Sequence, residues 1–218
     1  MELYLIRHGE MAGEPHMHYR PPVQGCLSEL GCQQAAALAQ AMLDVPLSAV
    51  HASPLGRALQ TAQAIAQERG LRIGIHEWLV EWRPATQTGE CPDPAQYEAM
   101  MKNAAELRPE QCWKTKAGEG CLEMWGRIVP GFLQLMEHHG VEAGHGGYLM
   151  PEGDQQRVAI VAHGGSLGVL AAFLMGVPAQ PYSPFAFECA GVMQVTFVQR
   201  ADVWYPALRV RELQGRQA

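Results

Sequence analysis

The chain has 218 residues, 48% of them hydrophobic, so it is long enough to form one sizeable α/β domain. Its formal net charge is −6 and it contains no block of Lys or Arg, which argues against a nucleic-acid partner. No apolar run approaches the roughly eighteen residues that a membrane span needs, so no membrane association is expected.

The start of the chain and its cysteines predict the cellular compartment. A strand pattern begins directly after Met1, without a basic segment or a cleavage site, so no signal peptide is expected. The six cysteines show no close pairing. We interpret them as reduced thiols, because a chain of this size can bury its own core without disulfides. The sequence therefore predicts a cytoplasmic protein.

Strand and helix signals alternate along most of the chain, as is typical of an α/β fold. The last two strands in this pattern are compatible with antiparallel pairing. In chain order, the pattern predicts a strand over Leu3–Ile6, a helix over Glu29–Leu43, a strand over Leu47–Ala52, a helix over 54–69, a strand over Leu71–Ile75, a helix over 122–136, a strand over Val158–Ala162, a helix over Ser166–Met175, and strands over Val192–Val198 and Ala207–Val210.

The helix ends have recognisable signals. Ser28 is a good N-cap for the first helix. For the second helix we expect Ser53 as the N-cap, Pro54 at the first helical position and Gly70 just after the end. Pro130 lies inside the third helical pattern and is expected to kink that helix or to displace its start.

The stretch 83–120 is less regular, with one helix predicted over 94–107. We interpret it as an inserted cap, because such segments often set substrate choice. Nearby aromatic residues are candidates either to line an apolar or sugar-stacking surface or simply to pack in the core. These residues are Trp78, Trp82, Tyr97 and Trp113.

Three histidines, His138, His139 and His145, lie in or next to a second irregular stretch, 140–156. No His-x-x-x-His or Cys-x-x-Cys spacing accompanies them, so no metal site is predicted there. The role of the stretch 138–147 stays open.

Three strand-to-helix junctions carry unusual polar residues: Arg7-His8-Gly9, the run Ser53–Arg57, and His163-Gly164-Gly165. In a parallel sheet these junctions lie at one edge, so two imidazoles and two guanidiniums converge beside helix N-termini. This combination suits a phosphate, because arginine offers forked donors and helix amides add more. The sequence has no Walker-type glycine loop and no clustered carboxylates that imply magnesium.

The same residues predict phosphoryl-transfer chemistry. A neutral imidazole can attack phosphorus and give a phosphohistidine. Arg7, Arg57 and the second imidazole are expected to stabilise charge on the equatorial oxygens. The residues alone leave open whether His8 or His163 attacks. Glu81 is either an ordinary surface carboxylate or a proton donor whose pKa neighbouring tryptophans raise by desolvation.

Six stretches of the chain also match a known family pattern, in the family's order and over most of the chain. They are Leu5-Ile6-Arg7-His8-Gly9-Glu10, Gln24-Gly25, Leu27–Gly31, Ser53–Ala62, Leu79-Val80-Glu81 and Val161–Gly165. Together they resemble the histidine phosphatase superfamily, in its phosphoglycerate-mutase-like group.

The resemblance implies a role for each matching residue. His8 is expected to be the nucleophile that becomes phosphorylated. Glu81 is expected to protonate the leaving oxygen and later to deprotonate water, with Glu77 as the alternative acid. The residues expected around the phosphate are Arg7, Arg57, His163, Gly164 and Gln24.

The chain departs from the family pattern in two stretches and at three single positions. The loop between Gln24 and Leu27 is shorter than usual, and Trp82-Arg83-Pro84 follows Glu81 where the family commonly has Gly-rich sequence. Glu14 stands where many relatives have asparagine, and Gly168 where phosphatase-type relatives often have arginine. Gly165 stands where mutase-type relatives often have asparagine. Because that asparagine is missing, hydrolysis is favoured over mutase action.

We therefore predict one histidine-phosphatase-like domain over 1–218. Its fold is expected to be a three-layer αβα sandwich: a mostly parallel sheet with helices on both faces and a cap inserted at about 83–120. The predicted function is that of a metal-independent phosphomonoester hydrolase, without cofactor, acting through a phosphohistidine on a small phosphorylated metabolite. The alternatives are a phosphoglycerate-type mutase, a non-catalytic phospho-ligand or protein-binding module, and a metal-dependent hydrolase. The sequence indicates neither the substrate nor the oligomeric state.

Overall fold

The structure is a computed structural model that describes residues 1–12, 27–83, 118–178 and 184–209, with scattered residues between 95 and 115. The strands are β1 (Glu2–Arg7), β2 (Ala49–Ala52), β3 (Ile73–Ile75), β4 (Lys114–Thr115), β5 (Gly118–Glu119), β6 (Glu142–Gly144), β7 (Gly147–Leu149), β8 (Arg157–Ala162), β9 (Val192–Arg200) and β10 (Val203–Arg209). The helices are α1 (Glu29–Ala41), α2 (Gly56–Gln67), the short 3₁₀ helix η2 (Glu77–Leu79), α4 (Cys121–His138) and α5 (Gly164–Leu174).

The main sheet of the described residues is mixed, with the strand order β3-β2-β8-β1-β9-β10-β7-β6. The strands from β3 to β1 pair in parallel, whereas every pair from β1 to β6 is antiparallel. The prediction of a mostly parallel sheet is therefore wrong. The reason is that β6–β7 and β9–β10 are hairpins, and a tight turn can join antiparallel strands only.

The β6–β7 hairpin falls in a stretch that the sequence indicates as irregular. Its turn places His145 at φ 53° and Gly146 at φ 77°. Two successive residues with positive φ are typical of the tight turns that match the twist of a hairpin. Because each strand has three residues, the sequence offers too short an alternation to reveal them.

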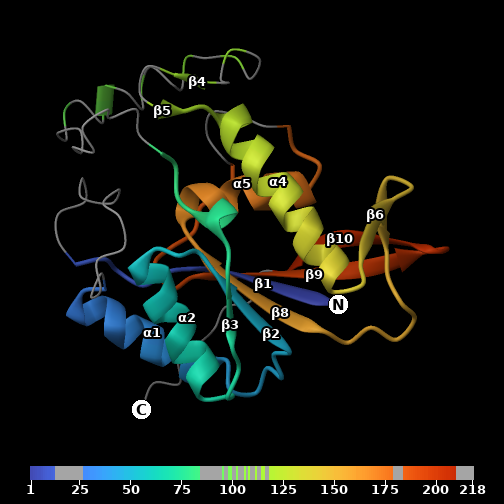
Figure 1. The fold of residues 1–218 in the computed structure, drawn as a ribbon, viewed down its shortest axis with the longest axis horizontal. Helices are drawn as coiled ribbons and strands as arrows, with labels where there is room; N and C mark the ends of the chain where they lie inside the picture. The colour runs from blue at the N-terminus through green and yellow to red at the C-terminus, as the bar shows by residue number, and fades with distance from the viewer. Residues whose placement is uncertain are drawn as a thin grey trace.

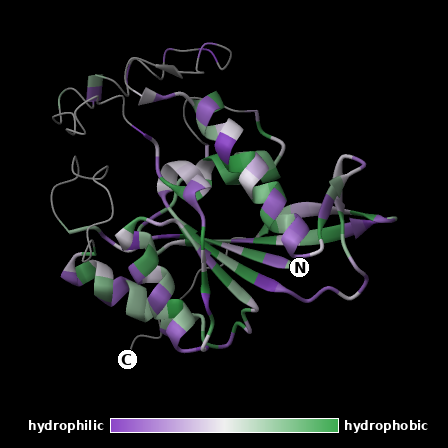
Figure 2. Cartoon of the chain, in the orientation of Figure 1, coloured by the Kyte–Doolittle hydropathy of each residue, from purple (hydrophilic) through white to green (hydrophobic). Residues whose placement is uncertain are grey.

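Helices cover both faces of the sheet, as predicted, and the central strand β1 explains why. Tyr4 and Ile6 point into the core beneath α1 and α2, whereas Leu3 and Leu5 point into the core beneath α4 and α5. Figure 1 shows the two helix pairs on opposite sides of the strands. In Figure 2, α1 and α4 alternate between hydrophobic and hydrophilic residues, as expected of helices with one packed face.

The helix ends differ in how well the sequence predicts them. Ser28 caps α1, since its hydroxyl accepts a hydrogen bond from the Gly31 amide at 2.9 Å. Ser53 does not cap α2, whose N-cap is Leu55. Instead, the Ser53 hydroxyl contacts the imidazole of His163. Pro130 lies inside α4, which starts at Cys121 without displacement.

Most of the predicted cap, including its helix over 94–107, lies outside the described residues. Of that stretch, β4 and β5 form a two-stranded antiparallel sheet, which Figure 1 shows near the start of α4 and apart from the main sheet. The described cysteines Cys32, Cys121 and Cys189 carry reduced thiols. Among the described helices, none combines the length and the apolar character that crossing a membrane requires.

Candidate active site

Three adjacent parallel strands bring the predicted junctions to one edge of the sheet. β8 lies between β2 and β1, and the chain continues from these strands into Ser53, His8 and His163. The His8 amide donates to the Ala162 carbonyl, and the His8 carbonyl accepts from the Ala190 amide, both at 3.0 Å. The end of β8 and the turn before β9 therefore fix the His8 backbone from both sides.

The two predicted imidazoles lie next to each other. His8 and His163 are 4% and 0% exposed, and their ring centroids are 5.0 Å apart. The Arg57 Nε–H donates to His8 Nε2 at 3.1 Å. Because a guanidinium can only donate, Nε2 is the acceptor, and the proton of the neutral ring lies on Nδ1. Nδ1 then donates to the Gly9 carbonyl at 2.6 Å.

Arg57 comes from the first turn of α2 and is 3% exposed. One turn later, the Thr61 hydroxyl donates to the Arg57 carbonyl at 2.8 Å and accepts from the Gly9 amide at 3.1 Å. Thr61 thus ties the start of α2 to the turn that follows His8. The same turn packs tightly on α1, because a Cβ on Gly9 would lie 2.6 Å from the Gly31 carbonyl oxygen.

His163 is held by Ser53, whose Oγ lies 2.8 Å from His163 Nε2. Burial lowers the pKa of His163 well below its usual value, and the nearby guanidinium charges of Arg57 and Arg7 lower it further. The imidazole is therefore neutral at physiological pH. A neutral imidazole still provides one N–H donor.

Arg7 and Gly164 lie together at the same edge. The Arg7 NH1 group donates to the Phe187 carbonyl at 2.5 Å. Arg7 Nε and His163 Nδ1 are buried without a hydrogen-bond partner among the described residues. A Cβ on Gly164 would lie 3.8 Å from the Arg7 guanidinium carbon, so the backbone passes close to this cation. An anion that binds here gains donors that are already desolvated.

The Glu81 carboxylate also reaches this edge. It accepts hydrogen bonds from the Gly165 amide at 3.0 Å and from the Trp82 amide at 2.8 Å. The Gly165 amide belongs to the first turn of α5, directly after His163. Glu77, the alternative acid, is exposed at the start of η2.

The structure brings Arg7, His8, Arg57, Glu81, His163 and Gly164 together. Gln24 and Glu14 lie outside the described residues, as do Tyr97 and Trp113. Ser53 and Thr61 support the site, but Ser53 was predicted only as a helix N-cap and Thr61 was not singled out. A serine directly after a buried strand, and a threonine four residues after an arginine on the same helix face, are the signals that could have identified them.

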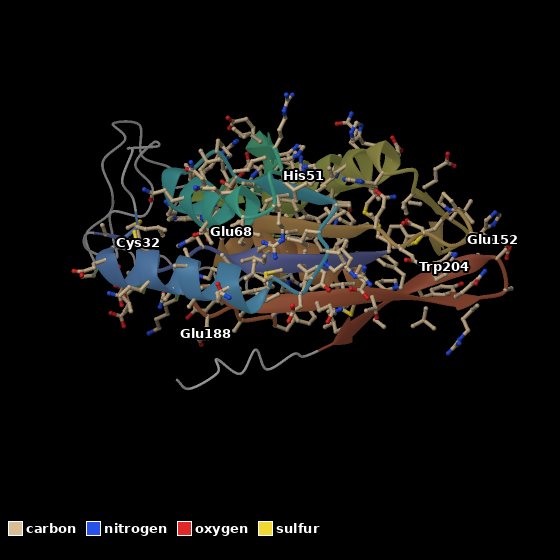
Figure 3. The ribbon with its side chains drawn as sticks, turned by 90° about the horizontal axis from the view of Figure 1, so that it is seen from below. Cys32, His51, Glu68, Glu152, Glu188 and Trp204 are labelled. Carbon is tan, nitrogen blue, oxygen red and sulfur yellow. The ribbon has the colours of Figure 1, made fainter. Side chains whose placement is uncertain are left out.

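Four other histidines form a chain that runs from β2 and the end of β3 to the end of α4. His51 Nδ1 lies 2.9 Å from His76 Nε2, and His51 Nε2 lies 3.1 Å from His139 Nε2. His139 Nδ1 lies 2.8 Å from Gln156 Oε1, and the His138 ring lies against His139. Figure 3 shows His51 between the β3 side of the sheet and α4. Across the described ranges, no group of three or more His, Cys, Asp or Glu side chains is placed to hold a metal ion.

The chain is similar to known proteins over most of its length. The probable phosphoglycerate mutase GpmB of Erwinia tasmaniensis is 29% identical over 179 residues, which is 82% of this chain and 77% of that protein. A putative α-ribazole-5′-P phosphatase from Escherichia coli is 26% identical with a TM-score of 0.71, covering 96% of both chains. A mycobacterial glucosyl-3-phosphoglycerate phosphatase is 22% identical with a TM-score of 0.73, covering 96% of this chain and 98% of that one, and it shares the fold.

A family model decides the classification. The model of the histidine phosphatase superfamily (branch 1) matches residues 3–204, which is most of the chain and includes the site. This match confirms the resemblance predicted from the sequence and the prediction of an enzyme of the histidine phosphatase type. The chain belongs to the histidine phosphatase superfamily, branch 1.

Proposed function

We propose that this protein hydrolyses small phosphomonoesters without a metal ion, through a phosphohistidine formed on His8. The observation that carries the proposal is the tautomer of His8. Its proton is committed to the Gly9 carbonyl, which leaves the lone pair on Nε2; this lone pair accepts from Arg57, and an entering phosphoryl group has to replace that contact beside the second, neutral imidazole. A neutral imidazole with an oriented lone pair is a competent nucleophile for phosphorus.

The surrounding donors suit the charge that develops during the transfer. Arg7, Arg57 and His163, together with the Gly164 amide at the start of α5, offer N–H groups toward the non-bridging oxygens of a phosphoryl group. Their positions are fixed before substrate binds, so little reorganisation is needed. Gln24 remains a proposed phosphate-binding residue on the basis of the family pattern alone.

Glu81 is the proposed general acid and base. In the first step the Nε2–P bond forms, the P–O ester bond breaks, and the Glu81 carboxyl gives its proton to the leaving oxygen. In the second step water attacks phosphorus, the N–P bond breaks, and the Glu81 carboxylate takes the proton of the water. Glu81 is preferred to Glu77 because its carboxylate lies against the α5 amides beside His163.

The substrate class is proposed from the named relatives and the site. Two structural neighbours are named as phosphatases, one for α-ribazole-5′-P and one for glucosyl-3-phosphoglycerate. Both substrates are small phosphorylated metabolites. This supports a small organic phosphate as the substrate of this chain.

The proposal is tested by hydrolysis of p-nitrophenyl phosphate with EDTA present throughout. We expect the wild-type protein to be active and His8→Asn to lose at least about 10³-fold in kcat, because asparagine retains a donor near Nδ1 but removes the nucleophile. His145→Asn, the same change on the exposed turn, is the matched control and is expected to be as active as wild type. Phosphate binding without turnover in the wild-type protein supports a non-catalytic binding module instead. Activity that EDTA removes supports a metal-dependent hydrolase.

A mutase is the second candidate, because the GpmB relative is named a probable phosphoglycerate mutase. One contact favours hydrolysis. A Cβ on Gly165 would lie 2.3 Å from the Glu81 carboxylate oxygen, so Glu81 fills the space where mutase-type relatives often carry asparagine. Incubation with a phosphoglycerate separates the two candidates: a mutase interconverts its isomers, whereas the proposed hydrolase releases inorganic phosphate.

A further inference from the structure

A buried ion pair contacts the backbone of the segment that carries Glu81. Arg127 of α4 and Glu119 of β5 form a forked contact, with Nε to Oε1 at 2.6 Å and NH2 to Oε2 at 2.8 Å. Their side chains are 14% and 5% exposed. Burying such a pair is costly unless its other polar atoms also find partners. Those partners therefore indicate what the pair does.

The further hydrogen bonds of the pair go to the backbone on both sides of Glu81. Arg127 donates from NH1 to the Trp78 carbonyl at 2.7 Å and from NH2 to the Glu81 carbonyl at 3.1 Å. Glu119 Oε2 accepts from the Arg83 amide at 3.0 Å, and the Glu119 amide donates to the Arg83 carbonyl at 2.8 Å. The segment 78–83 is thus held at its start, its middle and its end.

Side chains of the same segment reinforce this attachment. The Trp82 Nε1–H donates to the Glu119 carbonyl at 2.5 Å. The Trp78 indole lies flat against α4 at Gly131, where a Cβ would lie 2.3 Å from the indole Cγ. Stability alone does not explain an ion pair at this place, because well-packed apolar residues of similar volume serve stability equally well or better. The forked geometry instead fixes three carbonyl and amide positions at once.

We propose that Arg127 and Glu119 are positioning residues for Glu81: they fix the backbone on both sides of it, so that its carboxylate reaches the first turn of α5 beside His163. The inference rests on the proposed acid role of Glu81. The charge of Arg127 is close enough to the site to contribute to the lowered pKa of His163. Lysine cannot replace the arginine fork, because an ammonium group cannot reach both carbonyls and both carboxylate oxygens in one geometry.

A comparison of two substrates of similar shape, p-nitrophenyl phosphate and phenyl phosphate, distinguishes a misplaced acid from a general loss of activity. The p-nitrophenolate leaving group needs no proton, whereas the phenolate of phenyl phosphate is a poorer leaving group that benefits from one. The quantity to measure is kcat/KM, because it reports the steps up to release of the alcohol and is independent of the later hydrolysis of the phosphohistidine. For Arg127→Lys and Glu119→Gln we expect kcat/KM to fall about 10- to 100-fold on phenyl phosphate and less than about threefold on p-nitrophenyl phosphate.

Arg157→Lys is the matched control. Arg157 also pairs with a carboxylate, Nε to Glu2 Oε2 at 3.1 Å, but at the opposite end of the parallel strands. We expect this variant to keep the wild-type ratio of the two kcat/KM values. A thermal melt of each variant shows that the protein is folded, and Glu119→Gln provides the test if Arg127→Lys does not fold.

The Glu81→Gln variant tests whether Arg127 acts through Glu81. If Arg127 acts through Glu81, adding Arg127→Lys to Glu81→Gln changes the substrate ratio no further. Equal losses on both substrates, or a full additional loss in the double variant, overturn the positioning role while leaving the proposed hydrolase intact. A wild-type protein that is inactive on both substrates contradicts the proposed function, and with it the acid role on which this inference rests.

Discussion

The position of the Glu81 carboxylate depends on the absence of a side chain at residue 165. The Glu81 carboxylate accepts from the Gly165 amide, and a Cβ on this glycine would lie 2.3 Å from its Oε1. At the neighbouring Gly164, the nearest contact of a Cβ would be an ordinary 3.8 Å. A methyl side chain therefore fits at residue 164 but collides with the Glu81 carboxylate at residue 165.

This difference gives a prediction for a pair of variants. Gly165→Ala displaces the Glu81 carboxylate, so we expect kcat/KM for phenyl phosphate to fall about tenfold or more, with a smaller effect on p-nitrophenyl phosphate. Gly164→Ala is the matched control, and we expect it to keep the wild-type ratio of the two rates. Parallel kinetics on both purified variants provide the measurement. Equal ratios in the two alanine variants would contradict the placement of the acid.

The site residues also show which single-residue features a sequence can predict. Arg7, His8, Arg57 and His163 were predictable because they follow strands or start helices where folding requires no such side chain. Arg127 was not predicted, although it is the only Lys or Arg within the helical pattern 122–136. Its partner Glu119 comes from the irregular stretch before that helix. No local sequence pattern indicates that Arg127 and Glu119 contact each other next to the segment that carries Glu81.

At the scale of elements, a chain of imidazoles joins β2, the end of β3 and the end of α4. The Gln156 amide nitrogen donates to the His139 carbonyl at 2.9 Å, which leaves Oε1 to accept from His139 Nδ1. His139 Nε2 then accepts from His51 Nε2, and His51 Nδ1 accepts from His76. Gln156 thus sets the tautomers of all three neutral rings. A second proton on His51 would place its Nδ1–H against the Nε2–H of His76.

This chain has a consequence for stability at acid pH. Burial, followed by the charges of His76, His139 and His138, lowers the pKa of His51 to about 4 from the ordinary 6.5. Burial also lowers the pKa of His76, with a contribution from His138. Between pH 6.5 and pH 4 the unfolded state binds more protons at His51 than the folded state does. Stability from this group is therefore complete above pH 6.5 and is lost as the pH falls toward 4.

We expect acidification from pH 7 to pH 4.5 to lower the free energy of unfolding by about 1–2 kcal/mol through His51, after allowance for partial exposure. Urea unfolding of the wild-type protein and of His51→Gln at both pH values measures this difference. The variant is expected to be less stable at pH 7 but to lose less on acidification. His145→Asn, on the exposed turn, is expected to retain the wild-type pH dependence. A His51→Gln variant that loses as much stability as wild type would rule out this role for the imidazole chain.

At the scale of the whole molecule, the sequence predicted the half of the sheet that carries the site. The long runs of apolar residues in β1 and β8 are recognisable as buried strands, and their junctions with helices indicate a parallel arrangement. The antiparallel half of the sheet was not fully predicted because β6 and β7 have three residues each, and because strand direction depends on which hairpins form. The prediction for 83–120 as a cap stays a prediction, since most of that stretch lies outside the described residues.

The proposed nucleophile is one atom, His8 Nε2, at the end of a parallel strand of the sheet. The most direct measurement is to mix the protein with a phosphorylated substrate, quench within milliseconds at alkaline pH, where phosphohistidine is stable, and map the phosphoryl group by mass spectrometry. The account predicts a phosphoryl group on His8 that is absent from His8→Asn and accumulates in Glu81→Gln. Turnover without a phosphorylated histidine, or a label on His163 instead, would contradict it.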